Sequence, residues 1–402
     1  MTAPSSPAAR RAPLAHLRAA TLLAAASAVT ALAVTALGGS GLRWTAVHLL
    51  TLGTATVLVA TLSHHFAATL LHAAEDRHAG GRLALLALGV AALLSSQLRI
   101  RPLVVLGATL ATAGVLWVWW DLRVMRRRAL TPGRFAFVVR AYQRAAGAFV
   151  HGALLGTLMT TGVFSGRWYT TARLAHIHVQ VLGWVGISLL ATIVFFGPTV
   201  LRRRMTQGAD ARAARAIRIG ATAVTIGVLA LLASALPGST GTALRLVAAG
   251  SFAAYAWGVG EVCLPLLRTP GRRAQASGLQ LLAAAIWFVA LAWADVIVVA
   301  TGSWQWLDVI GAAFGVGVLL QALLGASGGL VPMMFGRDAE ARDRMRTSME
   351  RGAIVRVAVV NGAALAAAAS AAGLPAATTA WLLASAALAC HVTLAVHGAR
   401  RR

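Results

Sequence analysis

Long apolar stretches recur from one end of this 402-residue chain to the other. A representative stretch is Leu174–Leu201, which reads LAHIHVQVLGWVGISLLATIVFFGPTVL. A helix of ~20 apolar residues matches the hydrocarbon thickness of a bilayer and satisfies its own backbone polar groups there. Charged residues make up only 12% of the chain, about half the usual share of a soluble domain. The pattern therefore predicts an all-α polytopic membrane protein with no segment left for a soluble domain.

Twelve such stretches are expected to cross the membrane as a single transmembrane domain over residues 17–398. They follow a disordered basic N-terminus, residues 1–16, and precede a basic C-terminal tail, residues 399–402. The expected spans are Leu17–Gly38, Trp44–Ala73, Arg82–Leu98, Pro102–Met125, Phe135–Val163, Leu174–Leu201, Ala213–Leu236, Thr242–Leu267, Ala276–Ala300, Trp306–Met334, Ala353–Gly373 and Ala376–His397.

Arginine supplies the positive charge of the chain, which has 36 basic residues, all arginine, and a formal net charge of +25. In a soluble protein this charge would indicate a nucleic-acid partner. Here the arginines lie in short loops and at helix ends, so we expect no nucleic acid and expect contacts with the lipid bilayer and its anionic headgroups. With the N-terminus inside, the inside segments hold 27 arginines and the outside loops 6. This asymmetry predicts a multi-pass plasma-membrane protein with both termini cytoplasmic.

The loop between the tenth and eleventh expected spans, Arg337–Arg351, differs in composition from the rest of the chain. It reads RDAEARDRMRTSMER and holds four of the eleven acidic residues. Opposite charges at helical spacing predict a short helix on the cytoplasmic surface with internal ion pairs.

Short motifs recur at intervals of about four spans. His48 is followed by Leu52 and Gly53, and His178 is followed at the same spacing by Leu182 and Gly183. Spans 6 and 10 also share a spacing, in which a Leu-Leu pair precedes Pro198 or Pro332 by eight residues. The equal separation of spans 2, 6 and 10 favours three four-helix units, an arrangement that commonly places sites at the interfaces between units.

Histidines at membrane depth are the candidate ligands for a cofactor. His48 lies near the outer end of span 2, and His176 and His178 lie near the outer end of span 6. His151 lies near the middle of span 5, and His65 lies toward the inner end of span 2. Ionisable groups inside a membrane are costly and mark functional sites. Imidazole is a common ligand of haem iron and of copper.

His176 and His178 differ in direction by ~200° on a helix, so they cannot face the same ligand. We therefore expect a metal site that uses His48 with either His176 or His178, and the pattern leaves open which one. His65 and His151 are further candidates for cofactor binding. The alternative interpretation is that each histidine is an interfacial polar residue, the more common role near a helix end.

Two acidic residues within spans are candidates of another kind. Asp295 lies in the outer third of span 9, and Glu261 lies in the inner third of span 8. Either can pair with a buried arginine such as Arg140 or Arg144, or relay protons. The sequence does not decide between these roles.

Several stretches resemble the membrane domain of actinobacterial "copper oxidase" proteins, in some of which a similar twelve-helix region is fused to a copper nitrite-reductase-like cupredoxin module. These stretches are HLLTLGTATVLVATLSHHF from His48, AHIHVQVLGWVG from Ala175, the run from Gln321 to Pro332, and Asn361. More distantly, the chain resembles NnrS and subunit I of the haem–copper oxidases. The resemblance implies a haem b and/or copper site held by intramembrane histidines, and a role with oxygen, nitric oxide or related redox stress.

The chain departs from that group in one informative way. Haem–copper oxidases carry histidines on spans 7 and 10, whereas neither span has one here and span 10 offers Gln321. An oxygen-reducing centre is therefore not expected, and whether the protein is an enzyme stays open. The chain contains no cupredoxin module and no P-loop, GxSxG, HExxH or CxxCH motif.

Three functions follow from these observations. The first is a haem- or copper-binding membrane protein that serves electron transfer, or nitrogen-oxide or copper handling. The second is a transporter without a cofactor, with a cavity at mid-depth near His151, Asp295 and Gln321. The third is a membrane anchor for a separate cupredoxin-type enzyme or another redox partner. The oligomeric state is not indicated.

Overall fold

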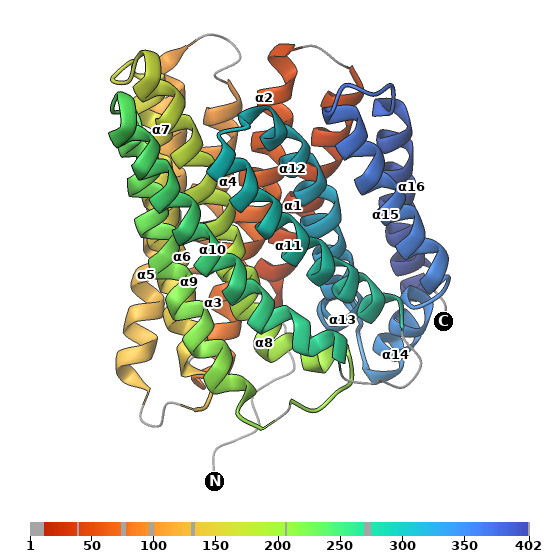
Figure 1. Cartoon of the computed structure of the whole chain (residues 1–402). Coiled ribbons are helices and arrows are strands. Elements are labelled where there is room, and N and C mark those ends of the chain that lie inside the picture. The colour runs from red at the N-terminus through yellow and green to blue at the C-terminus, as the bar shows by residue number, and fades with distance from the viewer. Residues whose placement is uncertain are drawn as a thin grey trace. The chain divides into compact units, whose positions relative to one another are not determined.

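The computed structural model describes residues 12–37, 40–73, 78–95, 100–129, 133–205, 207–268 and 275–400. These residues form helices and short connections, with no strand among them (Figure 1). Within the described residues, ten helical segments are long and apolar enough to cross a membrane. The prediction of an all-α, multi-pass membrane protein is therefore confirmed.

The remaining two expected spans fall on helices that fit a membrane less well. One coincides with a helix of 16 residues, Ala79–Leu94. The other coincides with Ala136–Thr160, which is long enough but carries the exposed Arg140 and Arg144. The first helix begins at Ala12, so residues 12–16, which were expected to be disordered, are helical. Residues 1–11, and residues 401 and 402 of the expected tail, lie outside the described residues.

The chain divides into two compact units. Unit 1 comprises Met1–Ser165 and Val179–Ser188, and unit 2 comprises Gly166–His178 and Leu189–Arg402. The helices of unit 1 are α1 (Ala12–Leu37), α2 (Ser40–His48), the π-helix η1 (Leu49–Thr56), α3 (Val57–Leu70), α4 (Ala79–Leu94), α5 (Arg101–Arg128), α6 (Ala136–Thr160) and the π-helix η3 (Val179–Gly186).

The helices of unit 2 are more numerous. They are α7 (Gly166–His178), α8 (Ile187–Val200, whose first two residues belong to unit 1), α9 (Ala209–Ala233), α10 (Gly238–Arg268), α11 (Ala276–Thr301), the short 3-10 helix η4 (Trp304–Trp306), α12 (Leu307–Ala313), the π-helix η5 (Phe314–Leu320), α13 (Gln321–Phe335), α14 (Ala339–Met349), α15 (Ala353–Ala371) and α16 (Ala377–Arg400).

Three membrane helices change from α to π geometry partway along their length. The changes occur in α2–η1–α3, α7–η3–α8 and α12–η5–α13, and the α-helices that follow have 14, 14 and 15 residues. The residues directly before the three π segments are His48, His178 and Ala313. π segments are rare and often lie at functional sites. The periodicity of the sequence did not predict them.

Small residues and one tryptophan bring the helices of unit 1 together. A Cβ on Gly89 of α4 would lie 2.7 Å from the backbone N of Ala111, so α4 and α5 approach backbone to backbone. Trp184 of η3 donates from Nε1 to Thr56 Oγ1 of η1 at 2.9 Å. The same indole packs edge-on against Phe149 of α6, with ring centroids 5.4 Å apart. Small residues that allow close helix approach, together with interhelical hydrogen bonds, stabilise membrane bundles.

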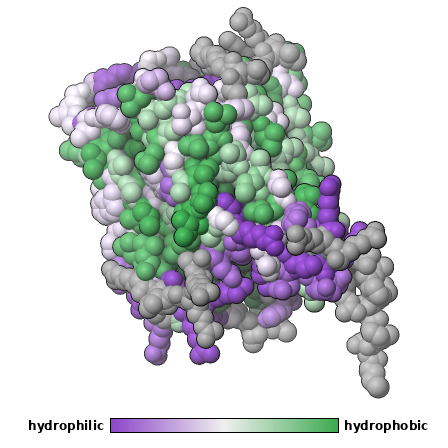
Figure 2. All heavy atoms as spheres, turned by 90° about the vertical axis from the view of Figure 1, so that its right-hand side faces the viewer, coloured by the Kyte–Doolittle hydropathy of each residue, from purple (hydrophilic) through white to green (hydrophobic). Residues whose placement is uncertain are grey.

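The segment Arg337–Arg351 contains the predicted short helix, α14. Asp338 caps it by accepting from the backbone N of Ala341 at 2.8 Å, and Glu340 pairs with Arg344 at 2.6 Å. The helix is not only a solvated surface element, because Met345 and Met349 are buried and α14 packs on α13 and α16. In the view of Figure 2, hydrophobic side chains cover broad areas between hydrophilic ones at the upper and lower ends, and the hydrophilic ones are more numerous at the lower end.

We expect the α4–α5 contact to tolerate no added side chain. Gly107→Ala would place a Cβ 2.5 Å from the backbone N of Leu93, and overpacking of this kind costs about 1–3 kcal/mol. Gly147→Ala on α6 is the matched control, since its Cβ would meet nothing within 4 Å. Thermal unfolding of the detergent-purified variants checks this. Equal melting temperatures for the two variants would contradict the close contact.

Candidate functional site

Among the described residues, the most deeply buried ion pair lies inside unit 2. His178, the last residue of α7, faces Asp295 of α11, with Nε2 3.1 Å from Oδ1. Their side chains are only 2% and 6% exposed. A buried ion pair gives little net stability, because removing both charges from water costs as much as their attraction returns. Such a pair within a membrane span is therefore a candidate for function.

Three contacts fix the His178 ring. Nδ1 donates to the carbonyl O of Leu174 at 2.7 Å, one helical turn earlier. Phe252 of α10 stacks on the ring, with centroids 4.8 Å apart and planes at 13°. Phe252 in turn fits against α9 because Gly227 has no side chain, and a Cβ there would lie 2.6 Å from the phenyl ring. Both ring nitrogens of His178 thus face acceptors, an arrangement that suits a protonated imidazolium.

Asp295 keeps one oxygen without a partner. Among the described residues, Oδ2 accepts no hydrogen bond, and the nearby Tyr255 hydroxyl, on a side chain only 1% exposed, also makes none. Buried polar atoms are normally hydrogen-bonded, so such groups indicate a place for a proton, a water molecule or an ion. The structure gives His178 as the partner of Asp295, and it gives Arg140 and Arg144, the arginines suggested from the sequence, as exposed on α6.

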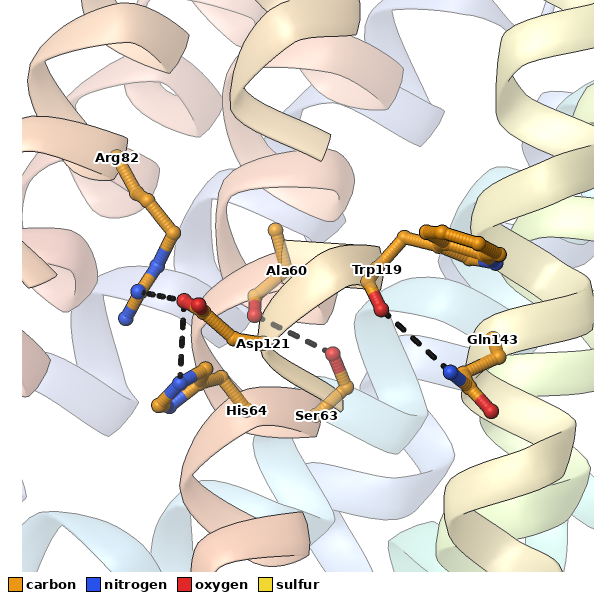
Figure 3. A network of polar contacts seen from close by, with 7 residues as sticks. All are labelled: Ala60, Ser63, His64, Arg82, Trp119, Asp121 and Gln143. Carbon is orange, nitrogen blue, oxygen red and sulfur yellow. Dashed lines mark hydrogen bonds and ion pairs between the residues drawn. The ribbon is translucent and has the colours of Figure 1, made fainter. Parts of the chain in front are cut away.

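A second polar centre lies in unit 1 (Figure 3). Arg82 of α4, only 5% exposed, forms an ion pair with Asp121 of α5, and Asp121 also lies 3.7 Å from His64 Nε2 of α3. A cavity of about 10 Å³ lined by His16, Thr61 and Arg82 adjoins the pair. That volume corresponds to about one water molecule. The geometry ties α3, α4 and α5 together around one carboxylate.

The other predicted ligands lie in different surroundings. His48 donates from Nδ1 to Trp44 O at 2.8 Å and stacks on that indole at 4.0 Å. His151 makes the same bond to Gly147 O at 2.8 Å but is exposed on α6. His65 is half-buried beside Phe66, with ring centroids 5.8 Å apart. His176 is half-buried, in contrast to His178.

A shared site between His48 and His176 or His178 stays a prediction, because His48 belongs to unit 1 and the other two to unit 2. In the part of the chain that the structure describes, no three side chains of the His, Cys, Asp or Glu type gather in a metal-binding group. His178 as placed does not fit a haem or copper ligand, since Asp295 occupies its outer nitrogen. His48 does fit, because metal-bound imidazoles commonly donate their other nitrogen to a backbone carbonyl.

The sequence predicts neither the His178–Asp295 pair nor the Arg82–Asp121 pair. In the sequence, Asp121 lies beside Trp117, Trp119 and Trp120, a grouping typical of an aromatic belt, and Arg82 only marks the start of an expected span. A signal was present, since each carboxylate stands alone in a long apolar helix and needs a buried cation. The sequence alone does not show which helices pack together, and that packing determines the partner. No protein-family model matches the chain, and no curated protein matches it.

We expect that removing one partner of the Arg82–Asp121 pair lowers the free energy of unfolding more than replacing both partners with apolar residues. Asp121→Leu alone would leave the buried Arg82 without its carboxylate and lower the free energy of unfolding by about 3–5 kcal/mol. The double variant Arg82→Met with Asp121→Leu should regain most of that loss, because it buries no unpaired charge. Chemical denaturation of both variants in detergent measures the difference. Additive losses would contradict a coupled buried pair.

Proposed function

We propose that this chain is a multi-pass plasma-membrane protein of the transporter-like class that moves protons, with His178 and Asp295 as the proton-carrying pair. The observation that carries the proposal is the burial of both side chains at 3.1 Å from each other inside a membrane helix bundle. Histidine and aspartate chains within membrane spans serve as proton relays in pumps and transporters. No cofactor is needed for this role.

The proposed architecture has twelve spans, both termini cytoplasmic and three four-helix units. The arginine distribution supports the topology, with 27 arginines in inside segments and 6 in outside loops. Support for the repeat comes from the second, sixth and tenth spans, each of which contains one of the π segments η1, η3 and η5. In this topology the His178–Asp295 pair lies in the outer half of the membrane.

The pair suits proton transfer for an electrostatic reason. While Asp295 is ionised, it attracts a protonated His178, and the Leu174 carbonyl and Phe252 ring hold the imidazole in place. A proton taken up from water at Asp295 Oδ2 neutralises the carboxylate and removes that attraction, so the imidazolium can release its own proton to water. The cost of an unpaired charge in a low-dielectric interior couples the two events.

We expect proton uptake by liposomes that contain the purified protein to depend on both side chains. Asp295→Asn and His178→Gln should each lower the rate of pH-gradient decay, followed with an internal pH dye, at least tenfold. His151→Gln is the matched control, because that histidine has the same backbone bond but is exposed, and its rate should equal that of the wild type. Wild-type proton flux in Asp295→Asn would overturn the proposal.

The second candidate is binding of haem b and/or copper, in electron transfer or nitrogen-oxide or copper handling. The specific observation in its favour is that His48 and His178 both directly precede a π segment and both donate from Nδ1 to the carbonyl four residues earlier. When bound, such a group would supply one-electron chemistry. His48 would hold it, while His178 would first have to leave Asp295. A role as anchor for a cupredoxin-type partner stays a prediction.

The absorbance spectrum and metal content of the purified protein test this second candidate. Haem or copper binding at His48 predicts a Soret band or stoichiometric copper that His48→Ala removes and His151→Ala retains. Absence of both signals in wild-type protein supplied with haem precursor and copper during expression would sink it. That outcome leaves the proton-transfer proposal intact, because that role uses no cofactor.

A further inference from the structure

We infer that unit 2 contains a second binding site, formed by the amide side chains of Gln280, Gln321 and Asn361, and that its ligand is an alkali cation. The inference uses none of the residues of the His178–Asp295 pair. Gln280 lies on α11, Gln321 opens α13 directly after the π segment η5, and Asn361 lies on α15.

The side-chain amides of the two glutamines are buried, and some of their atoms have no hydrogen-bond partner. Gln280 is 1% exposed and Gln321 is fully buried. Neither amide atom of Gln280 has a hydrogen-bond partner among the described residues, and neither has Oε1 of Gln321. A buried amide without a partner costs several kcal/mol in an apolar medium, on the order of 4–8 on an alkane scale. Two such side chains in one bundle therefore indicate that a ligand supplies what the chain does not.

Two contacts of small residues set the register between α11 and the η5–α13 segment. A Cβ on Gly325 would lie 3.5 Å from Cβ of Gln280, and a Cβ on Gly317 would lie 2.8 Å from the ring of Trp287. Gln321 stands four residues from each of these glycines. It therefore faces the stretch of α11 between Gln280 and Trp287, which includes the small, buried residue Ala284.

Hydrogen bonds orient the third amide toward the same place. Asn361 Oδ1 accepts from Trp287 Nε1 at 2.8 Å and from Gln321 Nε2 at 3.3 Å. Asn361 Nδ2 donates to the carbonyl O of Val357 at 2.8 Å. Because Gln321 donates to Asn361, its Oε1 is turned away from that bond and is the atom left for a ligand, together with Gln280 Oε1.

The chemistry of these groups selects the ligand. The three amides are neutral, and their unpartnered oxygens outnumber the single unpartnered NH₂ group, so the site favours a cation over an anion. Divalent cations are held by carboxylates, of which the amide cluster has none. A singly charged ion coordinated by carbonyl-type oxygens, with water completing its shell, fits best. Gln321 directly follows the π segment η5, and π segments often lie at functional sites.

The test is thermal unfolding of the purified full chain in NaCl, in KCl and in N-methyl-D-glucamine chloride at matched ionic strength and pH. We expect Na⁺ or K⁺ to raise the wild-type melting temperature saturably, by roughly 2 °C or more, since a ligand stabilises only the state that binds it. Gln280→Leu and Gln321→Leu should each abolish the rise. Gln143→Leu, which removes a buried glutamine of unit 1, should retain it.

Two outcomes overturn the inference. One is an equal melting temperature of the wild type in all three salts. The other is a cation response in Gln280→Leu or Gln321→Leu that matches that of Gln143→Leu, as expected if water alone filled the site. If one glutamine variant does not fold, the other decides. The response should persist in Asp295→Asn, which separates this site from the proton-carrying pair.

Discussion

Inside a bilayer core no water satisfies a backbone N–H or C=O group, so each must find a partner within the chain. The chain meets this demand with helices throughout its described residues. Some polar side chains bond to a carbonyl one turn earlier in their own helix, as His178 does to Leu174, and others meet a side chain on a neighbouring helix. His178 meets Asp295, and Arg82 meets Asp121. The small residues Gly227 and Gly89 give the helices and rings around these pairs their close approach.

The π segments give the three interrupted helices a common design. An added residue in a helical turn shifts the faces of the helix that follows, so the side chains before and after η3 need not share a face. Within that helix, His178 belongs to unit 2, while Trp184 belongs to unit 1, where it donates a hydrogen bond to Thr56. In the third interrupted helix, Ala313 stands where the other two have histidine, and the polar group appears later, as Gln321. The three helices thus share the α–π–α geometry but differ in the polar side chains that they carry.

The polar centres differ in whether they contain buried polar atoms without a partner, to which a ligand could bind. The Arg82–Asp121 pair balances its own charge, and its adjoining cavity of about 10 Å³ admits no more than a water molecule. Asp295 has an oxygen left over, and Gln280 has a whole amide left over. Buried polar atoms without a hydrogen-bond partner lower the stability of the folded protein. Such atoms are expected where a proton or an ion binds and is released.

The sequence by itself determined that this is a helical membrane protein, because the length of apolar runs depends only on the chain and the bilayer. It also determined the short helix near Arg337–Arg351, since its charges lie at local spacing. It marked His178 and Asp295 as unusual, because ionisable groups in apolar runs need no structure to be noticed. Only the tertiary structure decided that these two meet, that Arg82 belongs to Asp121, and that Gln280 and Gln321 share an interface. Partners more than a hundred residues apart, as His178 and Asp295 are, depend on helix packing, register and π segments that local periodicity does not encode.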